Sequence, residues 1–159
     1  MNLALQTERL ILTPCTDKTL LIYATKGYEL GPHIEMYLEE VKKDASALGW
    51  GVWLVIDKQT NNIIGDIGFK GKPDKDNSLE VGYGITSAEQ NKGYATEALN
   101  CLIEWAFNAD SVHKIIAECL EDNIPSIKVL KKLNMVKMKK DNQMLYWQLN
   151  KSAGKSLAL

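Results

Sequence analysis

The feature that most constrains the fold is a strand–helix–strand unit in the second half of the chain. Residues 78–86 (SLEVGYGIT) alternate apolar residues with polar residues or glycine, which is typical of a strand. A polar turn containing Gly93 follows, and residues 94–108 then carry apolar side chains at helical spacing. Residues 114–120 (KIIAECL) predict a short buried strand. This succession predicts a right-handed crossover between two parallel strands.

The rest of the chain predicts antiparallel strands and helices around this unit. Residues 50–56 and 63–70 are expected strands, joined by a polar connection of hairpin length. The other expected elements are a strand at 5–13, helices at 17–26, 34–45 and 125–133, and strands at 135–139 and 144–149. The order predicts an α+β fold in one domain, residues 1–150, followed by a C-terminal tail, residues 151–159. The sheet is expected to be mixed and mostly antiparallel, with about six to seven strands and about four flanking helices.

The composition argues against several classes of function. The 159 residues carry a formal net charge of −1, without the basic excess typical of proteins that bind nucleic acid. No apolar run approaches the roughly 20 residues needed to cross a bilayer, and the N-terminus lacks a signal-peptide pattern. We therefore expect a cytoplasmic protein without nucleic-acid or membrane partners. The cysteines (Cys15, Cys101, Cys119) and the two histidines lack metal-site spacing, so no metal is expected.

The turn before the long helix has the properties of an anion-binding site. Residues 90–95 (QNKGYA) lead into the helix, and Gly93 permits backbone conformations and close approaches that other residues disfavour. A helix N-terminus leaves N–H groups unpaired and carries partial positive charge, which favours phosphate. The alternative interpretation is that Gly93 only makes a tight turn.

The strand before this turn is expected to present an open trough. One face of the strand carries Leu79, Val81, Tyr83 and Ile85, and the other carries Glu80, Gly82 and Gly84. Glycine inside a strand often marks a close approach by another backbone. The two glycines therefore predict a trough beside Glu80 for a long, thin ligand with a phosphate at one end. A half-exposed strand with Glu80 in solvent is the alternative.

Residues 80–107 (EVGYGITSAEQNKGYATEALNCLIEWAF) resemble the acetyl-CoA-binding segment of the GNAT acyltransferases. Gln90, Gly93 and Ala95 match the signature Q/R-x-x-G-x-G/A of that family. Residues 123–135 (NIPSIKVLKKLNM) resemble the helix after its fifth strand, with Asn134 where the family usually has glycine. Asparagine also tolerates a left-handed backbone. The opening TERLIL is similar to the first strand of the RimJ/RimL-like branch, whose members acetylate ribosomal-protein N-terminal amines.

The resemblance implies a GNAT-like fold and an N-acetyltransferase that moves the acetyl group of acetyl-CoA to a primary amine. A protein or peptide N-terminus is the favoured acceptor. Backbone groups of residues 83–85 would pair with the pantetheine arm, and amides of residues 91–96 would hold the pyrophosphate. The implied cofactor-binding residues are Tyr83, Gly84, Ile85, Gln90, Asn91, Lys92, Gly93, Tyr94, Ala95, Thr96, Asn123 and Ser126.

Two side chains are candidates for proton transfer. Glu80 is the candidate general base, being the only acid on the glycine face of its strand, and burial would have to raise its pKa. Many GNAT enzymes place a tyrosine seven residues after the asparagine to protonate the leaving thiolate, but that position is Leu130 here. Ser126 would act on the sulfur instead, by analogy with the RimJ/RimL branch, or would only satisfy amides of the helix.

Other functions stay open at this stage. An acyl-CoA-binding sensor or scaffold without turnover is compatible with the missing tyrosine. Acetylation of a small amine, such as a polyamine or an aminoglycoside, is a variant of the enzyme hypothesis. Tyr28 and His33 lie where the acceptor wall forms in this family. A homodimer is an allowed assembly.

Overall fold

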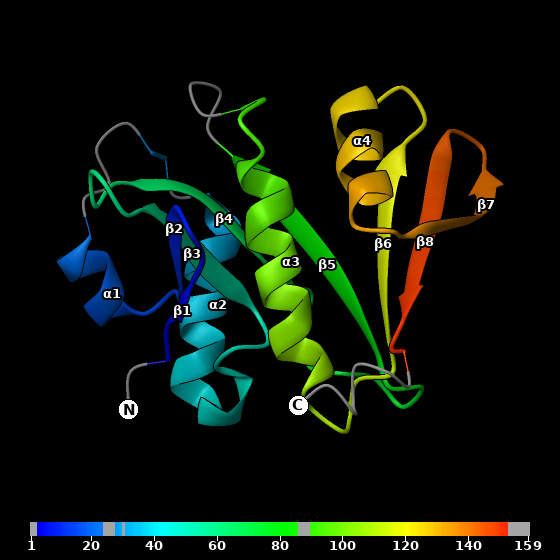
Figure 1. The fold of residues 1–159 in the computed structure, drawn as a ribbon. Coiled ribbons are helices and arrows are strands. Elements are labelled where there is room, and N and C mark those ends of the chain that lie inside the picture. Colours follow the sequence, from blue (N-terminus) through cyan, green and yellow to red (C-terminus); the bar gives the residue numbers. More distant parts are fainter. Residues whose placement is uncertain (1–2, 24–27, 30, 86–89, 153–159) are drawn as a thin grey trace.

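An eight-stranded sheet forms the centre of the computed structural model, which describes residues 3–23, 28–29, 31–85 and 90–152 (Figure 1). The strands, in the order in which they lie in the sheet, are β1 (Leu5–Gln6), β2 (Leu10–Pro14), β3 (Val52–Asp57), β4 (Ile63–Phe69), β5 (Ser78–Ile85), β6 (Lys114–Leu120), β8 (Met144–Asn150) and β7 (Val136–Asp141). The helices are α1 (Asp17–Ile22), α2 (Pro32–Lys43), α3 (Tyr94–Phe107) and α4 (Ile124–Lys132), with a short 3₁₀-helix η1 (Ala45–Ala47).

Strand pairing confirms the predicted meander and crossover. β2, β3, β4 and β5 are successive antiparallel neighbours, and β5 pairs in parallel with β6. The parallel register covers only three residues of each strand and ends where Glu80 lies opposite Ile116. Beyond that point β5 keeps its register with β4, and β6 keeps its register with β8. The two parallel strands therefore diverge toward their carboxyl ends (Figure 1).

One predicted strand is divided in two. The sequence predicts a single strand at residues 5–13, whereas β1 and β2 are antiparallel neighbours. In the turn between them, the Thr7 amide donates to the Leu10 carbonyl at 2.9 Å and the Leu10 amide donates to the Thr7 hydroxyl at 3.0 Å. Alternating apolar residues do not distinguish one strand from a tight hairpin. The described sheet therefore has eight strands instead of the predicted six to seven.

The apolar stripe of α3 forms the larger part of the core. The buried residues of this helix are Ala98, Leu99, Leu102, Ile103, Ala106 and Phe107, close to the set that the spacing predicts. They pack against β1, β2, β4 and β5. Each large apolar side chain that is fully buried there contributes roughly 1.5–3 kcal/mol. This packing fixes the position of the N-terminal end of α3.

Helix α2 covers the opposite face of the sheet. Ile34 and Tyr37, one helical turn apart, pack with Leu54 and Ile56 of β3 and Ile63 of β4. Because side chains alternate across a strand, these residues point away from α3. The sheet thus lies between α2 and α3.

The C-terminal part of the domain consists of α4 and the last two strands of the sheet. Helix α4 ends as expected for asparagine at the glycine position: Asn134 has φ 63°, and the Met135 amide donates to the Leu130 carbonyl at 3.1 Å. Strand β8 closes the domain at Asn150, and residues 153–159 of the predicted tail lie outside the described residues, as do residues 24–27, 30 and 86–89. No helix in the described ranges is long and apolar enough to cross a membrane.

Candidate active site

The turn before α3 has an open helix N-terminus. Gly93 is the N-cap residue, is exposed, and has φ +81°, a left-handed conformation that strains any residue with a side chain. Among the described residues no side chain caps α3 there, so its first N–H groups point into the turn. The side-chain amide of Gln90 donates to the Ile85 carbonyl at 2.9 Å and ties the turn to the end of β5. This geometry is that of an anion-binding helix terminus.

An ion pair fixes this turn to the β1–β2 hairpin. The Glu97 carboxylate in the first turn of α3 accepts from the Arg9 side chain at 2.7 Å, from the Arg9 amide at 3.0 Å and from the Thr7 hydroxyl. The Arg9 guanidinium also lies 4.2 Å from the centre of the Tyr94 ring. Burial raises the pKa of Glu97, but the hydrogen bonds from Thr7 and Arg9 outweigh it and lower the pKa overall. Arg9 thus compensates the acid in the first turn of α3, a role that sequence reasoning missed.

The predicted trough is present on β5. Leu79 and Val81 are buried toward α3, while Gly82 and Gly84 face a cavity on the other side of the sheet. A Cβ atom added at Gly84 would meet no other atom within 4 Å. The missing side chains therefore leave open space at the point where β5 and β6 diverge.

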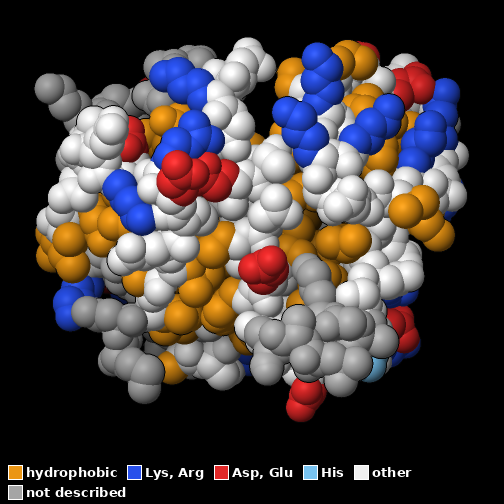
Figure 2. All heavy atoms as spheres, in the orientation of Figure 1, with side chains coloured by type: hydrophobic (Ala, Val, Ile, Leu, Met, Phe, Trp, Pro, Cys, Tyr) orange, Lys and Arg blue, Asp and Glu red, His pale blue; other side chains and the backbone are white. Residues whose placement is uncertain are grey.

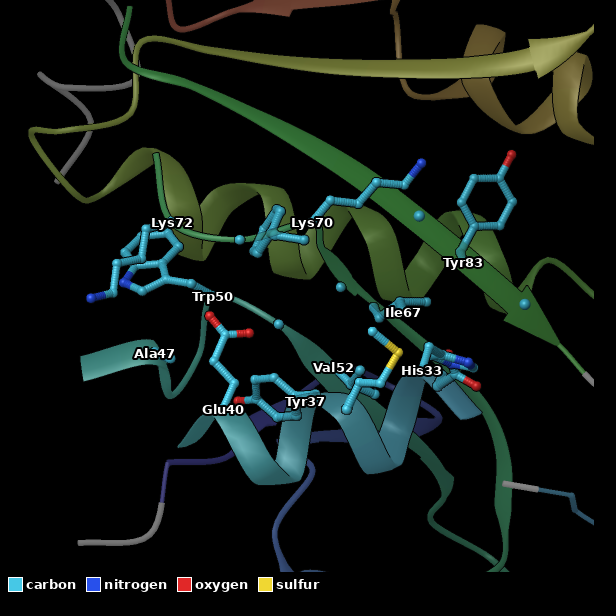
Figure 3. A pocket seen from close by; sticks show the side chains of 18 residues that line it. His33, Tyr37, Glu40, Ala47, Trp50, Val52, Ile67, Lys70, Lys72 and Tyr83 are labelled. Atoms are coloured by element: carbon cyan, nitrogen blue, oxygen red, sulfur yellow. The ribbon is translucent and has the colours of Figure 1, made fainter. Parts of the chain in front are cut away.

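The cavity has a volume of about 680 Å³ and lies between α2 and the face of β3, β4 and β5 (Figure 3). Its floor contains the glycines Gly51, Gly68, Gly82 and Gly84, and Tyr37 and Trp50 are among the aromatic residues that line it. In Figure 3 the side chains of His33, Tyr37 and Glu40 lie on the α2 side of the cavity, whereas the Tyr83 ring points away from α2, and its hydroxyl reaches the Ser126 carbonyl of α4. This size and mixture of apolar walls with few polar groups are typical of a small-ligand site.

Glu80 lies beside this cavity in an ion pair. Its carboxylate accepts from the Lys70 ammonium at 2.6 Å, and 27% of its side chain is exposed. It is not among the residues that line the cavity. The role of Glu80 as a general base stays a prediction, and it requires Lys70 to release the carboxylate.

A second acid lies on the glycine face, in the neighbouring strand. Asp66 of β4 is directly opposite Gly84 of β5, so its side chain points to the same side of the sheet. Its carboxylate accepts from the Tyr28 hydroxyl and lies 3.0 Å from Nε2 of His33. The side chain is 16% exposed, and burial raises the pKa of Asp66 to about 6. Sequence reasoning missed it because its face depends on pairing register, although it is the one charged residue in IIGDIGF.

The start of α4 approaches β5 across the divergence. The Ser126 amide donates to Oδ1 of Asn123 at 3.2 Å, so Asn123 is the side chain that caps α4. The Tyr83 hydroxyl donates to the Ser126 carbonyl at 3.4 Å, and burial raises the pKa of Tyr83. Leu130, at the position where many GNAT enzymes have a tyrosine, is 1% exposed and packs in the core. A protonated phenol from β5 therefore lies beside Ser126.

Comparison with known proteins identifies the family. The family model described as "Acetyltransferase (GNAT) domain" matches residues 9–136. The chain belongs to the GNAT acetyltransferase family. This GNAT chain is 40% identical over 120 residues to the uncharacterized N-acetyltransferase YnaD of Bacillus subtilis, covering 76% of this chain and 68% of YnaD.

Solved structures share the GNAT fold. Ribosomal-protein-S5-alanine acetyltransferase from Vibrio fischeri superposes with a TM-score of 0.72 at 21% identity, covering 95% of this chain and 98% of that one. N-acetyltransferase PseH of Campylobacter jejuni, solved in complex with acetyl coenzyme A, superposes with a TM-score of 0.59 at 23% identity, covering 75% and 78%. Acetyl-CoA is the acyl donor of GNAT acetyltransferases, the family to which this chain belongs.

The described residues fit that donor. The structure brings the end of β5, the turn at residues 90–96 and the start of α4 to one edge of the GNAT fold. The surface is hollowed between the N-terminal end of α3 and α4, and Lys and Arg side chains gather over α4 (Figure 2). Positive charge near that hollow suits an anionic ligand. No cluster of three His, Cys, Asp or Glu side chains in the described ranges is placed to hold a metal ion.

Proposed function

We propose that this acetyltransferase transfers the acetyl group of acetyl-CoA to a primary amine, with a protein or peptide N-terminal amine favoured. The observation that carries the proposal is that the free edge of β5 and the cavity adjoin each other at Gly82 and Gly84. The free edge of β5 beyond Glu80 offers backbone groups to a pantetheine arm, and the cavity lies directly behind the same residues. An acceptor in the cavity would therefore reach a thioester held on β5.

The binding roles of the predicted cofactor residues are part of this proposal. Backbone groups of residues 83–85 would pair with the pantetheine arm as an added strand does. Amides of residues 91–96 would hold the pyrophosphate, supported by the left-handed Gly93 and the uncapped start of α3. Asn123 and Ser126 would line the arm near the thioester, where α4 approaches β5.

The energetics of deprotonation favour an N-terminal amine as acceptor. The attacking nitrogen must be neutral, which costs an α-amine of pKa ~8 about 1.4 kcal/mol at pH 7. A lysine side chain of pKa ~10.4 costs nearly 5 kcal/mol under the same conditions. A single carboxylate assists the first deprotonation more readily than the second.

The charges around the cavity also favour a cationic acceptor. The carboxylates of Glu40 and Asp66 line it. The lysines that line it, Lys70 and Lys72, are each held by an acid, at 2.6 Å from Glu80 and 2.8 Å from Asp44. An amine that arrives as an ammonium ion therefore enters a cavity whose own cations are already compensated.

The RimJ/RimL-like branch is the narrower assignment that we propose. It is supported by the TERLIL opening, in which Thr7 and Arg9 anchor the start of α3 through Glu97. The thiolate that leaves coenzyme A would take a proton through Ser126 or from the Tyr83 phenol beside it. A homodimer stays a prediction, which light scattering checks.

A panel of amines tests the proposal. Purified protein is mixed with acetyl-CoA and each amine, and released coenzyme A is measured with a thiol reagent. The panel contains peptides with a free N-terminus, the same peptides with a blocked N-terminus, polyamines and aminoglycosides. We expect thiol release with free N-terminal peptides and none with their blocked counterparts.

Two results would redirect the proposal. Turnover with a polyamine or an aminoglycoside alone would make the small amine the acceptor. Tight acetyl-CoA binding without thiol release from any amine would favour the sensor or scaffold function. Binding of acetyl-CoA is measured separately by calorimetry, so the two results are distinguished.

A further inference from the structure

The position of Asp66 in the sheet points its carboxylate into the cavity. Antiparallel register pairs it with Gly84, within the segment of β5 proposed to hold the pantetheine arm. Glu80 lies four residues before Gly84, roughly 13 Å away along the strand at 3.3 Å per residue. Asp66 is therefore the carboxylate directly beside the segment proposed to hold the pantetheine arm, and it lines the cavity where Glu80 does not.

The groups around Asp66 form hydrogen bonds with its carboxylate, but none of those described is a lysine or arginine. Titratable groups face it from three packed segments: Cys15 after β2, Tyr28 in the segment before α2, and His33 in α2. The residues opposite Asp66 in the two flanking strands are Leu54 and Gly84, and neither titrates. Among the described residues, no lysine or arginine forms an ion pair with Asp66.

A purely structural role explains this arrangement poorly. A buried carboxylate that has no lysine or arginine partner and only the His33 imidazole beside it costs stability, and a structural residue at this position would gain from being neutral. Two hydrogen-bonding partners nevertheless fix the orientation of Asp66, and a 680 Å³ cavity gives access to it. A buried acid in a cavity that has a perturbed pKa is a candidate for function.

We propose that Asp66 receives the ammonium group of the acceptor and takes one of its protons. The inference rests on the proposed acetyl transfer. One N–H bond of the ammonium breaks and the proton moves to a carboxylate oxygen of Asp66, which leaves a neutral amine. The nitrogen then attacks the thioester carbonyl, the C–N bond forms and the C–S bond breaks. A second proton passes from nitrogen to the leaving sulfur, and Asp66 releases its proton to solvent.

Proton affinities support this assignment over an ordinary carboxylate. Transfer from an amine of pKa ~8 to a carboxyl group of pKa about 6 is unfavourable by about 100-fold. Transfer to an aspartate with an unperturbed pKa near 3.9 is unfavourable by about 10,000-fold. Burial therefore makes Asp66 a stronger base while it stays ionised above pH 6.

The test compares Asp66→Asn with wild type, Asp57→Asn and Glu80→Gln. Asp57 ends β3 outside the cavity and provides the matched control. For an amine that turns over, kcat/KM is measured between pH 5 and 9, with acetyl-CoA affinity and thermal unfolding measured alongside. We expect kcat/KM of wild type and of Asp57→Asn to fall as the pH drops below about 6, the acid limb of the pH profile. Asp66→Asn should lose that limb and at least ~100-fold of kcat/KM at pH 7.5, while it still folds and binds acetyl-CoA.

Clear results would overturn the inference. An unchanged acid limb in Asp66→Asn refutes it, and loss of the limb in Glu80→Gln alone would make Glu80 the base. Tyr28→Phe gives a further readout: losing the hydroxyl donor should move the limb to higher pH, because the carboxylate loses stabilisation. An unmoved limb argues against Asp66.

A second measurement does not depend on turnover. Carboxyl ¹³C NMR of the protein with coenzyme A follows the titration of Asp66 with and without n-butylamine. A bound ammonium favours the carboxylate and should lower the apparent pKa of Asp66. An unmoved titration refutes the inference even if no amine in the panel is acetylated, so this failure is distinct from failure of the proposed function.

Discussion

Replacing Asp66 by asparagine should stabilise the protein at neutral pH and above. The folded protein holds the Asp66 carboxyl at a pKa of about 6 because it is buried, against an ordinary value of 3.8. The folded state therefore binds this proton more tightly than the unfolded state does. Stability from Asp66 is fully present below pH 3.8 and is lost as the pH rises through about 6. Asparagine has no such proton and avoids this loss.

The size of the effect follows from the difference in pKa. At about 1.4 kcal/mol per pH unit, the difference from 3.8 to about 6 amounts to about 3 kcal/mol at pH 8. Asparagine keeps an oxygen that accepts the Tyr28 hydroxyl, so little of this gain should be lost to a broken hydrogen bond. Urea denaturation at steps from pH 4 to pH 8 measures the free energy of unfolding of both proteins.

We expect the two unfolding free energies to converge near pH 4 and to separate progressively up to pH 8, with Asp66→Asn the more stable. Asp57→Asn should follow wild type throughout. A variant that is less stable than wild type at pH 8 would refute the reasoning. Asp66 would then contribute more through Tyr28 and His33 than its burial costs. The expected gain in stability, together with lost activity, is the pattern of a residue retained for function.

Three further predictions concern the coenzyme site. Gly93→Ala places a side chain on a residue with a left-handed backbone, which costs about 1–2 kcal/mol, and puts its Cβ 3.5 Å from the Arg9 guanidinium. The affinity for acetyl-CoA, measured by calorimetry, should therefore fall. Tyr83→Phe removes the hydroxyl beside Ser126 and should lower kcat by up to about tenfold, with acetyl-CoA affinity unchanged, in the thiol-release assay. Glu97→Gln weakens the charged bonds to Thr7 and Arg9 and should cost about 1 kcal/mol at pH 7. Because the pKa of Glu97 is lowered in the folded state, that cost should be lost in urea denaturation as the pH falls below the ordinary value of 4.5 and through the lowered pKa.

Each of these predictions has a contradicting result. Undiminished acetyl-CoA affinity in Gly93→Ala would argue against phosphate binding at this turn. Full kcat in Tyr83→Phe would leave the proton donor to Ser126 or water. A Glu97→Gln variant equally destabilised at pH 3 and pH 7 would show that packing, not charge, holds the hairpin on α3.

Local pattern was sufficient for most of the elements and for the shape of the turn before α3. The spacing of apolar residues in α3 and the alternation in β5 predict those elements, because helical and strand periodicities differ. The left-handed Asn134 and the positive φ of Gly93 follow from residue types that tolerate this conformation. The predicted binding roles of residues 90–96 stay predictions that the experiments above address.

Pairing register, by contrast, is decided only by the folded sheet. No local pattern in IIGDIGF states that Asp66 lies opposite Gly84, or that Lys70 holds Glu80. The β1–β2 hairpin was likewise missed, because alternation alone does not show where a strand turns. The sequence by itself determined the helices, the central strands and the turn that suits a phosphate, since these depend on neighbours along the chain. Which acid enters the cavity, and how strongly it holds its proton, was decided by tertiary structure, because burial and facing partners come from strands and helices distant in sequence.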